Sequence, residues 1–181
     1  MNYINTKTLV YPVTEEVIRG QYPNILFPQP FVPPKDYAVV FLAPAAQYDP
    51  LTQGVREIAP EFTNKGVWEQ RWEVYALDPE LVAQNKAAQR KALFDSIVAG
   101  TQAHLDAFAK IRNYDGILSL CTYATSSVPK FRAEGQYGVQ ARDLTWAKLY
   151  EILAEVESGT RPLPAGFAEI ETQLPPLVWP I

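Results

Sequence analysis

The clearest periodic pattern of the chain lies at residues 67–76, where apolar and charged side chains alternate. Trp68 and Trp72 fall on one side of this pattern, and Glu69 and Glu73 fall on the other. A period of two is that of a β-strand with one covered face. Two further apolar runs and a glycine turn complete the front of the chain: strands at 37–42 and 55–59, and a turn at 64–66. The pattern predicts a three-stranded antiparallel meander, which is marginally stable alone and therefore packs on something else.

A long helix is predicted after this sheet. Asp78 supplies an N-cap acceptor, Pro79 suits the first helical position, and Glu80 places a negative charge in the first turn. The apolar side chains that follow recur at helical spacing: Phe94, Ile97, Val98, Leu105, Phe108 and Ile111. Gly100 lies inside this stripe, and the sequence leaves open whether it interrupts the helix.

Three further helices are expected, at 14–19, 117–123 and 136–157. Thr14 is a suitable N-cap for the first, and Gly159 is a suitable stop for the last. Residues 162–181 show no periodicity but carry too many apolar side chains for a free tail. Five of them are expected to pack against the body of the chain or against a partner: Phe167, Leu174, Leu177, Val178 and Trp179.

Proline divides the chain into three parts. Of the 16 prolines, ten lie within 1–79, five lie within 162–180, and Pro129 alone lies between them. Because proline breaks helix interiors, the front and the tail are expected to be extended and the middle helical. We therefore predict an α+β protein with three parts: a Pro-rich β-meander domain at 1–77, a helical hairpin or three-helix domain at 78–160, and an extended Pro-rich C-terminal arm at 161–181.

Composition narrows the classes of function. The chain has 181 residues, 48% of them hydrophobic, and a net charge of −4. These values predict a folded chain with a sizeable core rather than a disordered one. The mild acidity argues against nucleic acid as a partner, because phosphate binding needs a basic surface. The sequence shows neither a signal peptide nor an apolar run of membrane-spanning length, so we expect synthesis in the cytoplasm without membrane insertion.

Reactive side chains are scarce. Cys121 is the single cysteine and His104 the single histidine, which excludes an internal disulfide framework and a metal centre built from several such residues. Cys121 lies in an apolar run that is typical of a buried, inert thiol. Glu69 and Glu73 are typical of a solvated strand face rather than of a glycosidase pair. Phosphate-binding and zinc-protease motifs are absent from the sequence, so we predict no enzymatic activity, no catalytic residue, no cofactor and no metal.

What the sequence offers in surplus is aromatic side chains and proline. Such residues are typical of a core or of a protein interface. The candidate interface residues are Trp68, Trp72, Phe167, Leu177 and Trp179.

Two sets of segments form a pattern that covers nearly the whole chain. The front set is 8–16, 22–24, 27–28, 37–40, 48–50 and the tryptophan pair of 68–74. The back set is 112–117, 123–126, 141–146 and the closing Leu-Pro-Pro-Leu-Val-Trp-Pro of 174–180. The front resembles tail-fibre assembly proteins of tailed bacteriophages, and the back resembles a C-terminal helical module of phage tail and fibre proteins. These motifs are structural, so no catalytic residue is carried over.

This resemblance implies a non-enzymatic virion protein of the tail or baseplate that attaches or supports tail fibres. The alternative that it leaves open is a tail-fibre assembly chaperone that is absent from the mature virion. The implied partners are other tail, fibre or baseplate subunits. A homo-oligomer is also implied, and a trimer in particular because fibres are trimers. The implied location is the virion tail, after synthesis in the host cytoplasm.

Overall fold

The computed structural model describes residues 1–180, which form two compact units: Met1–Lys86 and a second unit that begins at Ala87. The elements in chain order are β1 (Tyr3–Asn5), α1 (Glu15–Gln21), β2 (Tyr37–Phe41), β3 (Gln53–Phe62), β4 (Trp68–Ala76), α2 (Pro79–Lys110), α3 (Ile117–Thr122), the short 3₁₀ helix η1 (Tyr123–Thr125), α4 (Pro129–Glu157) and α5 (Phe167–Glu171). A sheet in the first unit and helices in the second make this an α+β protein, which confirms the predicted class.

The sheet of the first unit is four-stranded and mixed, so the predicted antiparallel meander is wrong. The strand order is β1-β2-β4-β3. Its outer pairs are antiparallel, but β2 runs parallel to β4, with Val40 opposite Trp68 and Phe41 opposite Glu69. The connection at 42–52 is long enough to run the length of the β3–β4 hairpin. Strand β3 therefore starts at the end of the hairpin that lies away from β2, and it is the edge strand, next to β4. The added strand β1 has three residues, which is too short to show a period.

The core of the first unit lies around α1. Ile18 is fully buried there, and Thr14 caps the helix as predicted by accepting the Val17 N–H at 3.4 Å. The Arg19 guanidinium lies 5.2 Å from the ring centroid of Phe27 and also contacts the Phe31 ring. The apolar residues of this core are contributed by β1, the segment between β1 and α1, α1, the proline-rich segment between α1 and β2, and β2: Tyr3, Val13, Ile18, Tyr22, Phe27, Phe31, Tyr37 and Val39.

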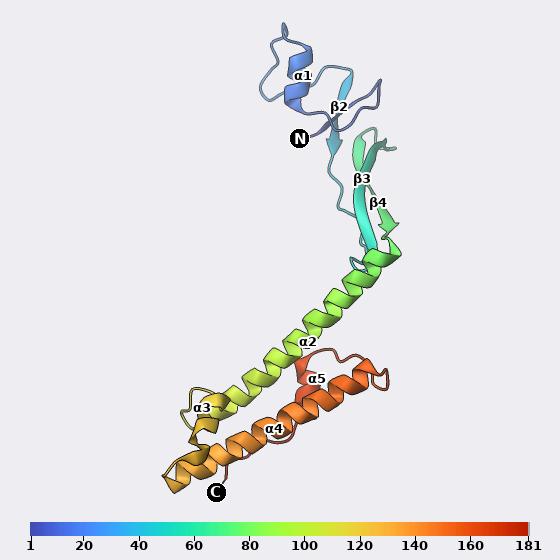
Figure 1. Cartoon of the computed structure of the whole chain (residues 1–181). Coiled ribbons are helices and arrows are strands. Elements are labelled where there is room, and N and C mark those ends of the chain that lie inside the picture. The colour runs from blue at the N-terminus through green and yellow to red at the C-terminus, as the bar shows by residue number, and fades with distance from the viewer. Residues whose placement is uncertain (181) are drawn as a thin grey trace. The chain divides into compact units, whose positions relative to one another are not determined.

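In the second unit, α4 lies alongside the part of α2 that follows residue 86 (Figure 1). The helix α2 is continuous through Gly100, and α4 begins at Pro129, seven residues before the predicted start at 136. Proline is well placed at the first position of a helix, where its missing N–H is not needed. Two groups of buried side chains hold the helices together. One contains Ile97, Leu149, Ile152, Ile170 and Leu174, and the other contains Leu105, Phe108, Ala109, Ile117 and Leu120.

The C-terminal arm folds back onto this helical pair. It contains the short helix α5, whose Ile170 is fully buried, and Leu174 is 8% exposed. At Gly100 the helix backbone comes so close to Phe167 that a Cβ atom would lie 2.5 Å from Phe167 Cγ. Gly100 therefore allows Phe167 to pack closely against α2 and is not a hinge in the helix.

We predict that Gly100→Ala destabilises the second unit. Alanine improves helix propensity by about 1 kcal/mol. However, the new methyl group meets the root of the Phe167 side chain, which rotation cannot move aside, and the overpacking costs about 1–3 kcal/mol. Urea denaturation followed by far-UV circular dichroism measures the net change. Gly20→Ala in α1 is the matched control, because in the described part of the chain nothing outside the adjoining residues and the local helix backbone lies within 4 Å of its added Cβ. This change is expected to be neutral or stabilising. Equal or greater stability of the Gly100 variant would contradict the prediction.

Candidate functional site

The β3–β4 hairpin has one charged face on which the charges pair with one another. Arg56 and Glu73 lie across the strands from each other, 2.6 Å apart. Arg71 contacts Glu61 at 3.3 Å. Both pairs are largely exposed, so each contributes less than about 1 kcal/mol to stability. Their main effect is that this face offers few unpaired charges to a partner.

The other face of the hairpin is mainly apolar, as the alternation in β4 predicts, with Gln70 and Glu57 as its polar members. Trp72 lies opposite Glu57, Val74 opposite Val55 and Trp68 opposite Phe62. The last of these pairs depends on a bulge between Ile58 and Glu61, which shifts the register by one residue. The Phe62 and Trp68 rings lie 5.5 Å apart, and Phe62 is 57% exposed.

This hairpin has no core of its own. Within 53–76, all of which the structure describes, Pro60 is the only buried residue. Trp72 is held partly by its indole N–H, which donates to the Ala43 carbonyl at 2.9 Å. A two-stranded ribbon with little buried apolar surface is marginally stable in water. We call the face formed by Val55, Phe62, Trp68, Trp72 and Val74 the ribbon face; it is the candidate interface of the first unit.

The other three sequence candidates belong to the second unit and pack within it. Phe167 contacts the group of buried residues around Ile97. Leu177 and Trp179 contact the group around Phe108. Of the two alternatives for the C-terminal arm, the structure therefore shows packing against the body of the chain, although Val178 remains 65% exposed.

Trp179 lies in an aromatic setting. Its ring stacks on Phe108 with centroids 4.2 Å apart, and the Arg112 guanidinium lies 4.5 Å from its centroid. Tyr114 and Tyr137 lie further out, at 6.3 Å and 6.4 Å. A cation over an indole face contributes about 0.5–2 kcal/mol. We call the space bounded by Phe108, Arg112, Tyr114 and Tyr137 the Trp179 slot.

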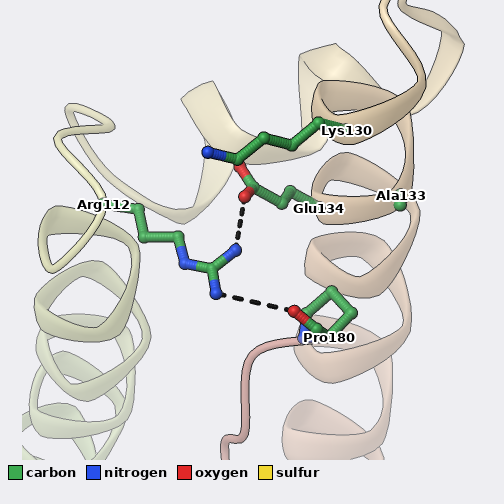
Figure 2. A pocket seen from close by; sticks show the side chains of 5 residues that line it. All are labelled: Arg112, Lys130, Ala133, Glu134 and Pro180. Atoms are coloured by element: carbon green, nitrogen blue, oxygen red, sulfur yellow. Dashed lines mark hydrogen bonds and ion pairs between the residues drawn. The ribbon is translucent and has the colours of Figure 1, made fainter.

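Arg112 also pairs with a buried carboxylate. The carboxylate belongs to Glu134 of α4, which is 3% exposed, and it accepts the Tyr114 hydroxyl at 2.6 Å as well as an Arg112 N–H. Figure 2 shows Arg112 placed between Glu134 and the Pro180 carbonyl. These three residues, together with Lys130 and Ala133, line a hollow of about 350 Å³.

The pKa values of these groups follow from their contacts. Burial acts to raise the pKa of Glu134, but the hydrogen bonds from Tyr114 and Arg112 outweigh it and hold the pKa below its ordinary value of 4.5. Burial together with the bond to Glu134 raises the pKa of Tyr114 to about 12. The carboxylate is therefore charged and the phenol neutral at physiological pH.

The remaining candidates for chemistry are not assembled into a site. His104 contacts Glu171 at 3.1 Å, whereas Cys121 packs beside the group around Phe108, and among the described residues no hydrogen bond joins Cys121 to His104. Burial raises the pKa of the Cys121 thiol, which disfavours the thiolate nucleophile. Within 1–180, no three His, Cys, Asp or Glu side chains are grouped closely enough to hold a metal ion. None of the helices there is long and apolar enough to span a bilayer.

Sequence reasoning missed several residues of these sites, among them Phe62, Arg112 and Glu134. Phe62 reaches the ribbon face only through the bulge, for which Pro60 in the strand was the available signal. Arg112 and Glu134 lie 22 positions apart, with α3 and η1 between them, and no local pattern joins them.

The comparisons with known proteins found no match: no family model, no curated protein and no solved structure is similar to this chain.

We predict that Glu134→Gln destabilises the second unit by about 1–3 kcal/mol at neutral pH, because a neutral amide replaces the charged acceptor of Arg112 and Tyr114. Since its folded pKa is lowered, the Glu134 carboxylate stabilises the fold above its unfolded pKa, and this contribution is lost as pH falls through the folded pKa. The variant should therefore lose less stability than the wild type below pH 4.5.

Urea denaturation at a series of pH values tests this prediction. Glu151→Gln is the matched control, because its side chain on α4 is 58% exposed and, among residues 1–180, pairs only with Lys148. We expect the control to follow the wild-type profile. Parallel pH profiles for Glu134→Gln and the wild type would show that this carboxylate is not responsible.

Proposed function

We propose that this chain is a non-enzymatic structural protein of a bacteriophage tail or baseplate, which attaches or supports tail fibres through protein–protein contacts. The observation that carries the proposal is the ribbon face, an apolar surface on a hairpin whose only buried residue within 53–76 is Pro60. The phage assignment itself rests on the resemblance of the sequence segments to tail and fibre proteins.

Three features support an interaction role over a catalytic one. Aromatic side chains such as Trp68 and Phe62 are the residues that contribute most to protein interfaces. The charged face of the same hairpin pairs its own charges, so the apolar face is the one left for a partner. The reactive side chains Cys121 and His104, in contrast, occupy different surroundings and have no shared hydrogen bond within the described part of the chain.

The proposal is tested in purified phage particles by quantitative mass spectrometry. We expect this chain to be present at a fixed stoichiometric copy number, as a tail component must be. Its absence from finished particles, together with its requirement for fibre formation, would support the alternative assembly chaperone instead.

A variant of the ribbon face tests the surface itself. We predict that Phe62→Ser lowers incorporation into particles at least about tenfold, which corresponds to losing about 1.4 kcal/mol of binding free energy. Phe62 is 57% exposed, so the fold of the hairpin should survive the change. Arg71→Ser on the opposite face is the matched control, since it removes only an exposed ion pair. Equal incorporation of both variants would contradict an interface at this face.

The rival enzymatic function is tested by Cys121→Ala combined with His104→Ala. We expect the double variant to fold and to support particle assembly within about twofold of the wild type, because the partly exposed His104–Glu171 pair contributes less than about 1 kcal/mol. Circular dichroism checks the fold, and plaque counts check assembly. A folded double variant that fails to assemble particles would revive a catalytic role for this pair.

A further inference from the structure

We infer that the Trp179 slot is a recognition site for an extended, proline-rich peptide, and that it takes residues Leu177–Pro180 from a second copy of this chain as well as from its own. This inference does not depend on the proposed tail function. It rests on how the slot holds the end of the C-terminal arm.

The slot recognises features that any extended peptide of this sequence would present. The indole of Trp179 lies between the Phe108 ring at 4.2 Å and the Arg112 guanidinium at 4.5 Å. The Val178 N–H donates to the Tyr137 hydroxyl at 2.7 Å, and the Pro180 carbonyl accepts from Arg112 at 3.5 Å. An aromatic groove that bonds the main chain of a proline-rich segment is a recurrent mode of peptide recognition.

The segment is held by few hydrogen bonds and belongs to no helix or strand. Within 175–180, the bonds of Val178 and Pro180 are the only two hydrogen bonds, and neither belongs to a helix or a strand. Pro175 and Pro176 separate it from Leu174, the last fully packed residue of the arm, and Pro176 is exposed. This proline pair keeps the released segment extended, so little conformational entropy is lost when it binds again.

Binding in cis also leaves a polar group unpaired. The buried Trp179 Nε1 has no hydrogen-bond acceptor among the described residues. A donor removed from water without a partner is destabilising, and this cost is recovered on release. The slot thus recognises an aromatic ring and the main-chain groups beside it, and a second copy of the chain supplies both.

The occupant in the proposal is a second copy of this chain, because residues 177–180 are the segment that fits the slot in the structure. At low concentration the tethered segment prevails, since a short flexible tether gives an effective concentration in the millimolar range. Exchange between copies therefore requires either a high protein concentration or a substitution that weakens the binding of one copy's own segment. The second condition allows a direct test.

The experiment mixes two full-length variants with complementary defects. Trp179→Ala has an intact slot and a defective segment, and Phe108→Leu has an intact segment and a slot without its stacking ring. Each alone should be monomeric. Mixed at near-millimolar concentration, they should form a heterodimer in native mass spectrometry, with a melting temperature above that of Trp179→Ala alone. The control mixture pairs Trp179→Ala with the double variant Phe108→Leu, Trp179→Ala, which has no intact segment and should give no heterodimer.

A peptide keeps the test decisive if Trp179→Ala folds poorly. A synthetic, C-terminally amidated peptide of residues 172–180 should bind this variant and raise its melting temperature or its helical circular dichroism, and the same peptide with alanine in place of tryptophan should not. A folded mixture without heterodimer would overturn exchange between copies. Failure of the peptide to bind or to restore helix would overturn peptide recognition by the slot.

Discussion

Burial of apolar surface by the C-terminal arm is the interaction on which the helical unit depends. Two helices in contact cover only the facing sides of their apolar stripes, and the remaining apolar surface is unfavourable in water. The side chains of Ile170 and Leu174 complete the group around Ile97, and Trp179 completes the group around Phe108. The arm is thus a third layer of the unit, and Gly100 is small because that layer must approach the helix backbone.

The sheet of the first unit meets the same requirement only in part. Around α1, aromatic rings and the buried Ile18 form a core, which the proline-rich segment covers. Further along, the β3–β4 hairpin extends beyond this core, and its apolar face is half-exposed. A surface of this kind is stable only to the extent that something else covers it. This difference between a covered helical pair and a half-exposed ribbon supports the proposal that the ribbon contacts a partner.

Local rules predicted the local features of this fold. The alternation in β4, the N-cap at Thr14 and the helix start at Asp78 were visible because each depends on neighbouring residues. The parallel pairing of β2 with β4, the three-residue strand β1 and the register shift before Phe62 depend on contacts between distant segments. For the same reason, the sequence indicated that Trp179 is packed but not that Arg112 and Phe108 enclose it.

Arg112 links the two interactions that fix the end of the helical unit. Its guanidinium pairs with the buried Glu134 and also lies over Trp179. A carboxylate on one side holds the planar group in place, which favours stacking on the other side, because an ordered guanidinium loses less entropy when it binds. The charge of Glu134 and the docking of the arm are therefore coupled through one side chain. Lysine at this position would keep the positive charge, but it has no planar group that could pair with Glu134 and stack on Trp179 at the same time. The site therefore requires arginine rather than any cation.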